Sequence, residues 1–277
     1  MMAGQKHSAL GRTPYYVLTG GLAIIFLFPL LWSFYASISP QASTGQIDGF
    51  GFGNYKTMFD FGAGLPTVAA NSAVISILTV VITLLISTLG GYAFARFRFW
   101  GKDALFLLTL SILMVPYATL LIPLYVMLNA LGLSNSLVGV ALMISMFQLP
   151  FATYMMRISF EAIPRELEES AHIDGCSTFG TLWRIMLPSV TPGLVTVGLF
   201  AFLAAWNDFF APLILLTDPL KQPLPVTVAN MRQQTMGVIN YGATEAGVVI
   251  MSVPCILLFL LLQRYYVRGF MSGAIKG

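Results

Sequence analysis

The sequence predicts an all-α, polytopic membrane protein on the strength of three observations. Hydrophobic residues make up 57% of the chain and charged residues only 9%, whereas about a quarter of the residues in soluble domains are charged. No Asp, Glu, Lys or Arg lies between Arg12 and Asp48, or between Asp60 and Arg96, and each gap exceeds the roughly 20 residues that cross a bilayer. The apolar runs are continuous rather than alternating, so the backbone must satisfy its hydrogen bonds as helices and not as a barrel.

Six crossings are expected within one transmembrane domain, 1–277. The first two fill the two charge-free gaps. A third charge-free stretch, from Asp103 to Arg157, is too long for one crossing, and the turn-forming residues 129–135 divide it into a hairpin. Two more apolar runs follow a polar loop. The predicted spans are residues 14–37, 67–93, 103–128, 136–157, 188–216 and 246–263.

The distribution of basic residues predicts the orientation of these spans. Six crossings put both termini on one side, and short cytoplasmic segments accumulate Lys and Arg. With the N and C termini in the cytoplasm, only Lys56, Lys221 and Arg232 lie outside. Eleven lie inside: Lys6, Arg12, Arg96, Arg98, Lys102, Arg157, Arg165, Arg184, Arg264, Arg268 and Lys276. The same bias explains the net charge of +3, which therefore gives no indication of nucleic acid binding.

The loop between the fourth and fifth spans, residues 158–187, is a polar island between apolar runs. Five of the eleven acidic residues lie in it, namely Glu161, Glu166, Glu168, Glu169 and Asp174. We expect two short helices that meet at a corner. Pro164 can open the first helix and Gly175 can end it in the left-handed conformation, and Ser177 or Thr178 can cap the second before Pro188 begins the next span.

The faces of these two helices suggest a docking element. Leu167 and Ala171 share a face of the first helix, with Ser170 beside them, and the neighbouring carboxylates offer charge-assisted hydrogen bonds to a basic partner. Local chemistry is equally compatible with an ordinary solvated acidic loop. The second helix is expected to carry one apolar stripe, made of Phe179, Leu182, Trp183 and Met186.

The spacing of the loop residues resembles a known motif. The pattern Glu169-x-Ala171-x-x-x-Gly175, nine residues, then Ile185-x-Leu187-Pro188 is similar to the EAA coupling loop of membrane subunits from ATP-binding-cassette (ABC) importers, with Ser170 in place of the first Ala. Three more stretches resemble MalG-like permeases of the carbohydrate-uptake branch of that family. They are Tyr92–Phe99, Trp206–Leu213 and Gln263–Gly277.

This resemblance implies a type I ABC importer permease with the MetI-like fold, in the cytoplasmic (inner) membrane of a prokaryote. The chain would form half of a translocation pore for a sugar or oligosaccharide. Its implied partners are a second homologous permease, two ATPase subunits, an extracytoplasmic solute-binding protein, the lipid bilayer and the sugar substrate. The residues implied to couple it to the ATPase are Glu169, Ser170, Ala171, Asp174, Gly175, Ile185, Leu187 and Pro188.

The chain carries no recognisable catalytic motif of its own. Gly101-Lys102 is followed by Asp103 and lacks the upstream Gly of a phosphate-binding P-loop. The two histidines, His7 and His172, are far apart and form no zinc or triad pattern. We therefore expect no catalytic, metal or cofactor-binding residues here, and ATP and Mg in the partner ATPase subunits.

A candidate substrate path comes from polar and aromatic residues in the apolar runs. Asp208 lies inside the fifth predicted span, where an ionisable side chain is by default a functional candidate, although a wet interfacial role is an alternative. Prolines such as Pro116 and Pro123 are expected to break helices near a lumen, and Phe147 is a further candidate platform for a sugar ring. The candidates for the path are Gln148, Phe151, Trp206, Asn207 and Asp208.

Two alternatives to a sugar importer remain. An ABC permease for another solute, such as a polyol or glycerol phosphate, would carry the same coupling motif, because the motif reports coupling and not cargo. A secondary transporter driven by an ion gradient is the other alternative. Such transporters commonly contain internal repeats and charged residues at the membrane midplane, and the chain shows no repeat and only Asp208 as a candidate.

Overall fold

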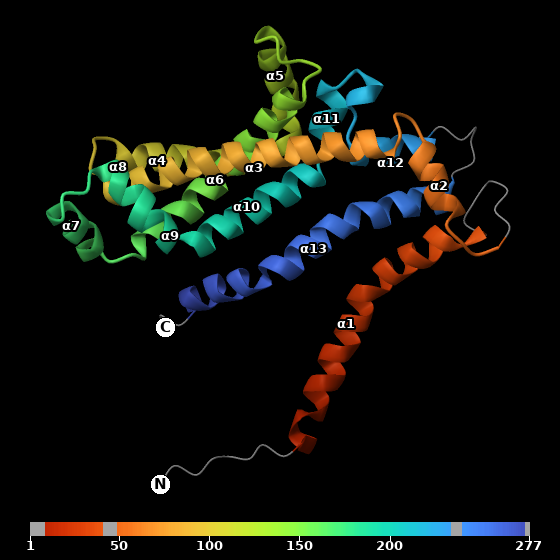
Figure 1. Ribbon diagram of the computed structural model, residues 1–277, viewed down its shortest axis with the longest axis horizontal. Helices are drawn as coiled ribbons and strands as arrows, with labels where there is room; N and C mark the ends of the chain where they lie inside the picture. The colour runs from red at the N-terminus through yellow and green to blue at the C-terminus, as the bar shows by residue number, and fades with distance from the viewer. Residues whose placement is uncertain (1–8, 41–48, 234–239, 275–277) are drawn as a thin grey trace. The chain divides into compact units, whose positions relative to one another are not determined.

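A computed structural model describes residues 9–40, 49–233 and 240–274, apart from the side chains of residues 9–13, 233 and 264–274. Within these ranges every regular element is helical (Figure 1). The elements are α1 (Ala9–Ile38), α2 (Gly53–Asp60), α3 (Leu65–Arg96), α4 (Lys102–Ser111), η2 (Ile112–Met114), α5 (Tyr117–Ala130), α6 (Leu137–Glu161), α7 (Arg165–Ile173), α8 (Thr178–Thr181), η3 (Leu182–Met186), α9 (Leu187–Ser189), α10 (Thr191–Trp206), α11 (Phe210–Leu215), η4 (Pro219–Lys221), α12 (Leu224–Gln233) and α13 (Tyr241–Ala274).

Among the described residues, four helices are long and apolar enough to cross a membrane. They are Pro14–Ile38, Leu65–Arg96, Leu137–Glu161 and Tyr241–Gln263. Two bent helix pairs raise the number to six if each pair counts as one span. The predicted spans 14–37, 67–93, 136–157 and 246–263 each fall on one of these four long helices. Lys6 and Lys276, which helped to predict the cytoplasmic termini, lie outside the described residues.

The predicted third span, 103–128, is not one helix. Lys102–Met114 and Tyr117–Ala130 meet at an angle of 108°. Val115 and Pro116 between them are extended, because proline lacks a backbone N–H and disfavours the helical conformation of the residue before it. Pro123, by contrast, lies inside α5 without ending it.

The predicted fifth span, 188–216, is also interrupted. Pro188 lies in α9, and the chain bends by 78° before α10 begins at Thr191. At the other end α10 stops at Trp206, and α11 starts only at Phe210. Asn and Asp side chains bond to nearby backbone groups and so compete with the helix, which explains why it ends just before Asn207 and Asp208.

Backbone contacts divide the chain into two units, one joining Met1–Phe61 with Val228–Ser252 and the other joining Gly62–Thr227 with Val253–Gly277. In the first unit, the buried Asn54 of α2 donates from Nδ2 to the carbonyl oxygens of Ser37 (3.0 Å) and Ser39 (3.2 Å). These bonds satisfy carbonyl groups at the end of α1, where no further helical turn can do so.

The second unit is organised around α3, which packs most extensively against α6 and α10 (Figure 1). One face of α3 carries small polar residues at helical spacing, and all of them are buried. They are Ser72, Ser76, Thr79, Thr83 and Ser87. Inside a bilayer the hydrophobic effect does not drive helices together, because lipid tails are as apolar as the side chains. Helices associate mainly through van der Waals packing, and small residues at the contact let their backbones approach closely.

Gly91 continues this face at the point of closest approach to α6. A methyl group at Gly91 would lie 2.5 Å from Cβ of Met156 and 2.9 Å from the backbone nitrogen of Arg157. The neighbouring Gly90 has ordinary space, since its nearest contact would be Thr153 Cγ2 at 3.6 Å. Of these two neighbouring glycines, only Gly91 therefore needs the absence of a side chain for packing.

At the other end of α3, polar side chains hold the loop that follows α11. Asn71 donates from Nδ2 to the carbonyl oxygens of Leu220 (2.9 Å) and Gln222 (3.1 Å). The hydroxyl of Ser72 accepts a hydrogen bond from the backbone N–H of Leu224 at 2.9 Å. Lys221 Nζ adds a bond to the carbonyl oxygen of Asn135 (2.9 Å). The loop is thereby fixed to the first turns of α3.

We predict that Gly91→Ala destabilises the protein and that Gly90→Ala does not. Overpacking a tight contact costs about 1–3 kcal/mol, because Met156 cannot move without shifting the backbone of α6. Denaturant unfolding of the purified protein in detergent measures the difference. Equal midpoints for the two variants would show that α3 and α6 are not in close contact at Gly91.

Candidate functional site

The polar loop forms two short helices joined at a corner, as predicted. Residues Arg165–Ser189, here called the elbow segment, comprise α7, α8, η3 and α9. Pro164 precedes α7, and Gly175 follows its end with a φ of +83°. The N–H of Cys176 then reaches back to the carbonyl oxygen of Ala171 (2.9 Å) and that of Gly175 to His172 (3.0 Å). This closing pattern needs the left-handed conformation that glycine adopts without strain.

Ser177 begins the second helix as predicted, because its hydroxyl accepts a hydrogen bond from the N–H of Gly180 (3.1 Å). The expected single apolar stripe is wrong. Leu182 and Met186 are buried, whereas Phe179 and Trp183 are 64% and 56% exposed and contact each other edge to face. The π-helical turn η3 widens the residue spacing, so the two pairs point in different directions.

The exposed part of the elbow segment is both apolar and acidic. Ile173 at the corner is 85% exposed, and Leu167, Phe179 and Trp183 are exposed as well. Glu169 is also exposed. Large apolar side chains that are exposed on the protein surface next to carboxylates are typical of a surface that another protein covers.

The predicted coupling residues occupy different environments. Ala171 is only 4% exposed and packs against the rest of the chain. Its small size therefore allows α7 to pack closely within the protein and does not contribute to the exposed surface. Ile185 and Leu187 are half-buried. The exposed members of the set are Glu169, Ser170, Asp174, Gly175 and Pro188.

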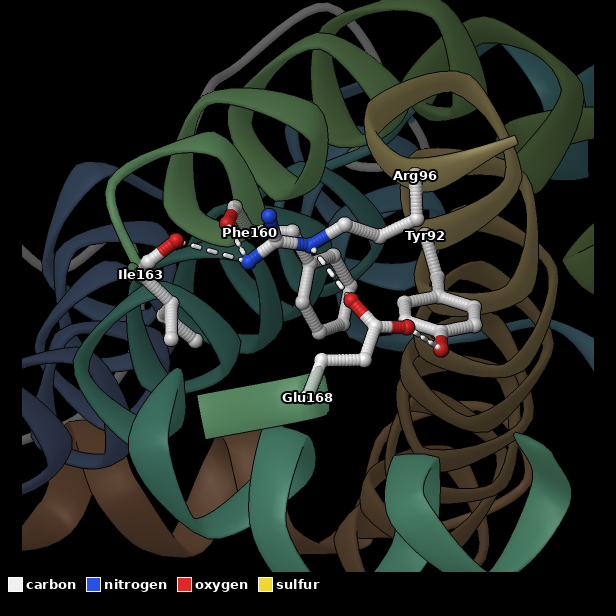
Figure 2. A network of polar contacts seen from close by, with 5 residues as sticks. All are labelled: Tyr92, Arg96, Phe160, Ile163 and Glu168. Atoms are coloured by element: carbon white, nitrogen blue, oxygen red, sulfur yellow. Dashed lines mark hydrogen bonds and ion pairs between the residues drawn. The ribbon is translucent and has the colours of Figure 1, made fainter. Parts of the chain in front are cut away.

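A polar network fixes α7 to the ends of α3 and α6 (Figure 2). Arg96 donates from Nη2 to the carbonyl oxygens of Phe160 (2.9 Å) and Ile163 (2.8 Å). Its Nε lies 3.2 Å from Oε2 of Glu168, as an ion pair without hydrogen-bond geometry. The hydroxyl of Tyr92 donates to Oε1 of the same carboxylate.

The network is largely shielded from solvent, with the Arg96 and Glu168 side chains 5% and 14% exposed. Arg96 satisfies carbonyl groups at the end of α6, where a cation is favourable for the helix dipole. Glu168 supplies the counter-charge from α7. One guanidinium group thus joins three helices.

Sequence reasoning did not find this network, although a signal existed. Tyr92 and Arg96 are four residues apart and so share one face at the end of an apolar helix. The acidic residue singled out by the motif was Glu169, whereas the network uses its neighbour Glu168. The two adjacent carboxylates therefore have different environments: Glu168 is half-buried against the chain, and Glu169 is exposed.

Three of the five candidate substrate-path residues line one cavity of about 630 Å³, namely Gln148, Asn207 and Asp208. Phe151 and Trp206 are not among its lining residues. Phe151 packs against Phe200, with ring centroids 5.3 Å apart, and the buried Trp206 stacks on Phe202 at 5.6 Å.

Tyr117 was missed as a member of this cavity. Its hydroxyl donates to Oδ2 of Asp208 at 2.7 Å, while Oδ1 accepts from the N–H of Ala211 at 2.8 Å. Phe147, considered as a sugar platform, does line the cavity. The position of Tyr117 directly after Pro116, at a helix break, is the feature that could have indicated it.

The family of the chain follows from comparison with known proteins. Residues 84–271 match the family described as "binding-protein-dependent transport system inner membrane component". The chain is 32% identical to the diacetylchitobiose uptake system permease protein DasC of Streptomyces coelicolor, over 98% of this chain and 100% of that protein. It is also 32% identical to the trehalose transport system permease protein SugB of Mycobacterium tuberculosis, over 96% and 98% of the two chains.

The fold is similar to that of a solved structure. A chain from a bacterial ABC transporter involved in the import of the acidic polysaccharide alginate superposes with a TM-score of 0.77, covering 96% of this chain and 100% of that one, at 23% identity.

The fold and the site therefore define a membrane-embedded transporter subunit. The chain belongs to the family of inner membrane components of binding-protein-dependent transport systems, whose members are ABC transporter permeases. The predicted fold class is confirmed, as is the prediction that the chain is a multi-pass inner membrane transporter subunit rather than an enzyme.

We predict that Arg96→Met destabilises the protein by about 3 kcal/mol, because breaking a buried pair leaves an uncompensated charge. Adding Glu168→Gln should recover part of the loss, which a double-mutant cycle on the unfolding free energy measures.

Glu161→Gln is the matched control for Glu168→Gln. Glu161 forms an exposed ion pair with Arg157 at 2.8 Å, four residues away in α6, and exposed pairs contribute about 0.5 kcal/mol or less. A loss for Arg96→Met no larger than that for Glu161→Gln would contradict the structural role of the network.

Proposed function

We propose that this chain forms half of the translocation pore of a sugar or oligosaccharide ABC importer and that the elbow segment couples the pore to ATP hydrolysis. A second permease completes the pore, two ATPase subunits bind and hydrolyse ATP with Mg, and an extracytoplasmic binding protein delivers the sugar. The permease relatives described above, from uptake systems for diacetylchitobiose and trehalose, support the cargo class.

The proposed orientation puts the elbow segment and both termini in the cytoplasm. It follows from the basic residues, of which eleven would lie inside and three outside. In this orientation the exposed side chains of Glu169, Ile173, Phe179 and Trp183 face the side where ATP is available.

One observation carries the mechanism: α7 is fixed to the pore helices through Arg96 and Glu168. An ATPase subunit that binds the exposed face of α7 moves a helix whose other face holds the ends of α3 and α6. Displacement of α7 is then transmitted to the transmembrane helices instead of being lost in a flexible loop. Glu169 gives the ATPase an exposed carboxylate, and Gly175 sets the angle of the corner.

We predict that Glu169→Lys and Gly175→Leu each uncouple the transporter. A charge-assisted hydrogen bond contributes about 1.5–3 kcal/mol, so reversal of Glu169 should weaken ATPase binding by about tenfold or more. Leucine at Gly175 would have to adopt a φ of +83° and would shift the corner. Sugar uptake into proteoliposomes and co-purification of the ATPase subunits measure both effects.

Two matched controls separate coupling from folding. Gly101 also has a positive φ, +76°, with open space around it, so Gly101→Leu introduces equal strain outside the elbow segment. Asp103→Lys reverses an exposed acid in the first turn of α4. Both controls should retain uptake at equal membrane abundance. Normal uptake by Glu169→Lys and Gly175→Leu would overturn the coupling role.

A further inference from the structure

Two interrupted helices meet beside one cavity in the second unit. The break between η2 and α5 at residues 115–116 and the gap between α10 and α11 at residues 207–209 are joined by the hydrogen bond from Tyr117 to Asp208. Inside a membrane, non-helical backbone is tolerated only where it is buried in protein or lines a cavity. Paired helix breaks of this kind mark the binding sites of many transporters.

The cavity beside these breaks has a volume of about 630 Å³, within the roughly 300–1,000 Å³ typical of small-molecule sites. Both breaks and α6 line it. Its polar groups are the Tyr117 hydroxyl, the Gln148 and Asn207 amides and the Asp208 carboxylate. Phe147 and Phe209 add aromatic surface, and the Phe147 ring packs edge to face against Tyr117 with centroids 4.5 Å apart.

The Asp208 carboxylate retains capacity for a ligand. Its two oxygens offer about four acceptor positions, and hydrogen bonds from Tyr117 and the N–H of Ala211 occupy two of them. The remaining positions can accept hydroxyl groups, and the Gln148 amide can both donate and accept. The Nδ2 of Asn207 already donates to the carbonyl oxygen of Leu203 (2.8 Å) and to Cys255 Sγ (3.8 Å), so Asn207 offers its amide oxygen as an acceptor. This combination matches a ligand that carries many hydroxyl groups on an apolar ring.

The lining also indicates the charge of that ligand. All of the cavity's described lining residues are uncharged except Asp208, and none is Lys or Arg. Phosphate and carboxylate groups are recognised by cations, most often through paired hydrogen bonds from Arg. A carboxylate in the cavity disfavours such anions, so the lining fits neutral carbohydrates and not uronates or sugar phosphates.

We propose that this cavity is a direct contact site for the transported substrate and that the substrate is a neutral, polyhydroxylated carbohydrate. The proposal rests on the proposed function, because it requires the chain to form part of a translocation path. Tyr117 and Asp208 bind sugar hydroxyls, and Phe147 and Phe209 pack against the ring. Glycerol phosphate is thereby disfavoured as cargo.

The test uses the complete transporter in proteoliposomes, with its second permease, ATPase subunits and binding protein. Radiolabelled trehalose and diacetylchitobiose serve as neutral probes, and an alginate trisaccharide as the acidic probe. The variants are Tyr117→Phe and Asp208→Asn, which preserve the shape of each side chain. Asp208→Asn also keeps an oxygen that can accept the hydrogen bond from the Ala211 N–H. Tyr125→Phe, on the same helix α5 but outside the cavity lining, is the matched control.

We expect uptake of a neutral probe, with KM raised about tenfold in Tyr117→Phe and Asp208→Asn, because each loses a hydrogen bond to the sugar that is worth about one order of magnitude. The kcat should change much less, since loss of uniform binding raises KM alone. Tyr125→Phe should match the wild-type protein.

Three results would overturn the proposal: transport of the acidic probe in preference to both neutral ones, a fall in kcat with KM unchanged, or an equal effect of Tyr125→Phe. A merely structural bond between the two helix breaks would give the second result. The outcome is separable from that of the coupling proposal. Raised KM values in Tyr117→Phe and Asp208→Asn, together with normal uptake by Glu169→Lys and Gly175→Leu, would support the substrate site and reject the coupling role.

Discussion

The contacts of the Arg96 guanidinium group are the interaction on which the proposed transmission mechanism depends. It is shielded from solvent and joins the end of α3, two carbonyl oxygens at the end of α6 and the Glu168 carboxylate of α7. A buried charge is retained only where geometry and hydrogen bonds compensate its desolvation, so this arrangement fixes one position of α7 relative to the pore helices. An exposed acidic loop thereby becomes a part of the rigid helical packing.

Local signals predicted the elbow segment well. The positions of Pro164, Gly175 and Ser177 were predicted from the conformations that each residue favours next to a helix end, and such preferences act over only a few residues. The apolar stripe failed because a π-helical turn changed the residue spacing after Thr181. Ala171 has the small size that the motif requires, but it packs within the chain instead of facing outward.

Contacts between distant residues were beyond sequence patterns. Arg96 and Glu168 are 72 residues apart in the sequence, and Tyr117 and Asp208 are 91 residues apart. Neither pair follows from periodicity or spacing, because only the packing of helices brings its members together. Asp208 itself was a reasonable candidate, since an ionisable residue in an apolar run is costly. Its place in a gap between α10 and α11, rather than inside a helix, required the structure.

The length of α3 has a mechanical consequence. Asn71 and Ser72 hold the loop after α11 at one end, and Tyr92 and Arg96 hold α7 at the other. Arg96 follows Asn71 by 25 positions, which corresponds to about 38 Å along the helix at a rise of 1.5 Å per residue. In the proposed orientation α3 is a single rod between opposite faces of the bilayer. Binding of a loaded receptor on one face and binding of nucleotide to the ATPase on the other would then act on the same helix, and each binding event would change the affinity of the other by an equal factor.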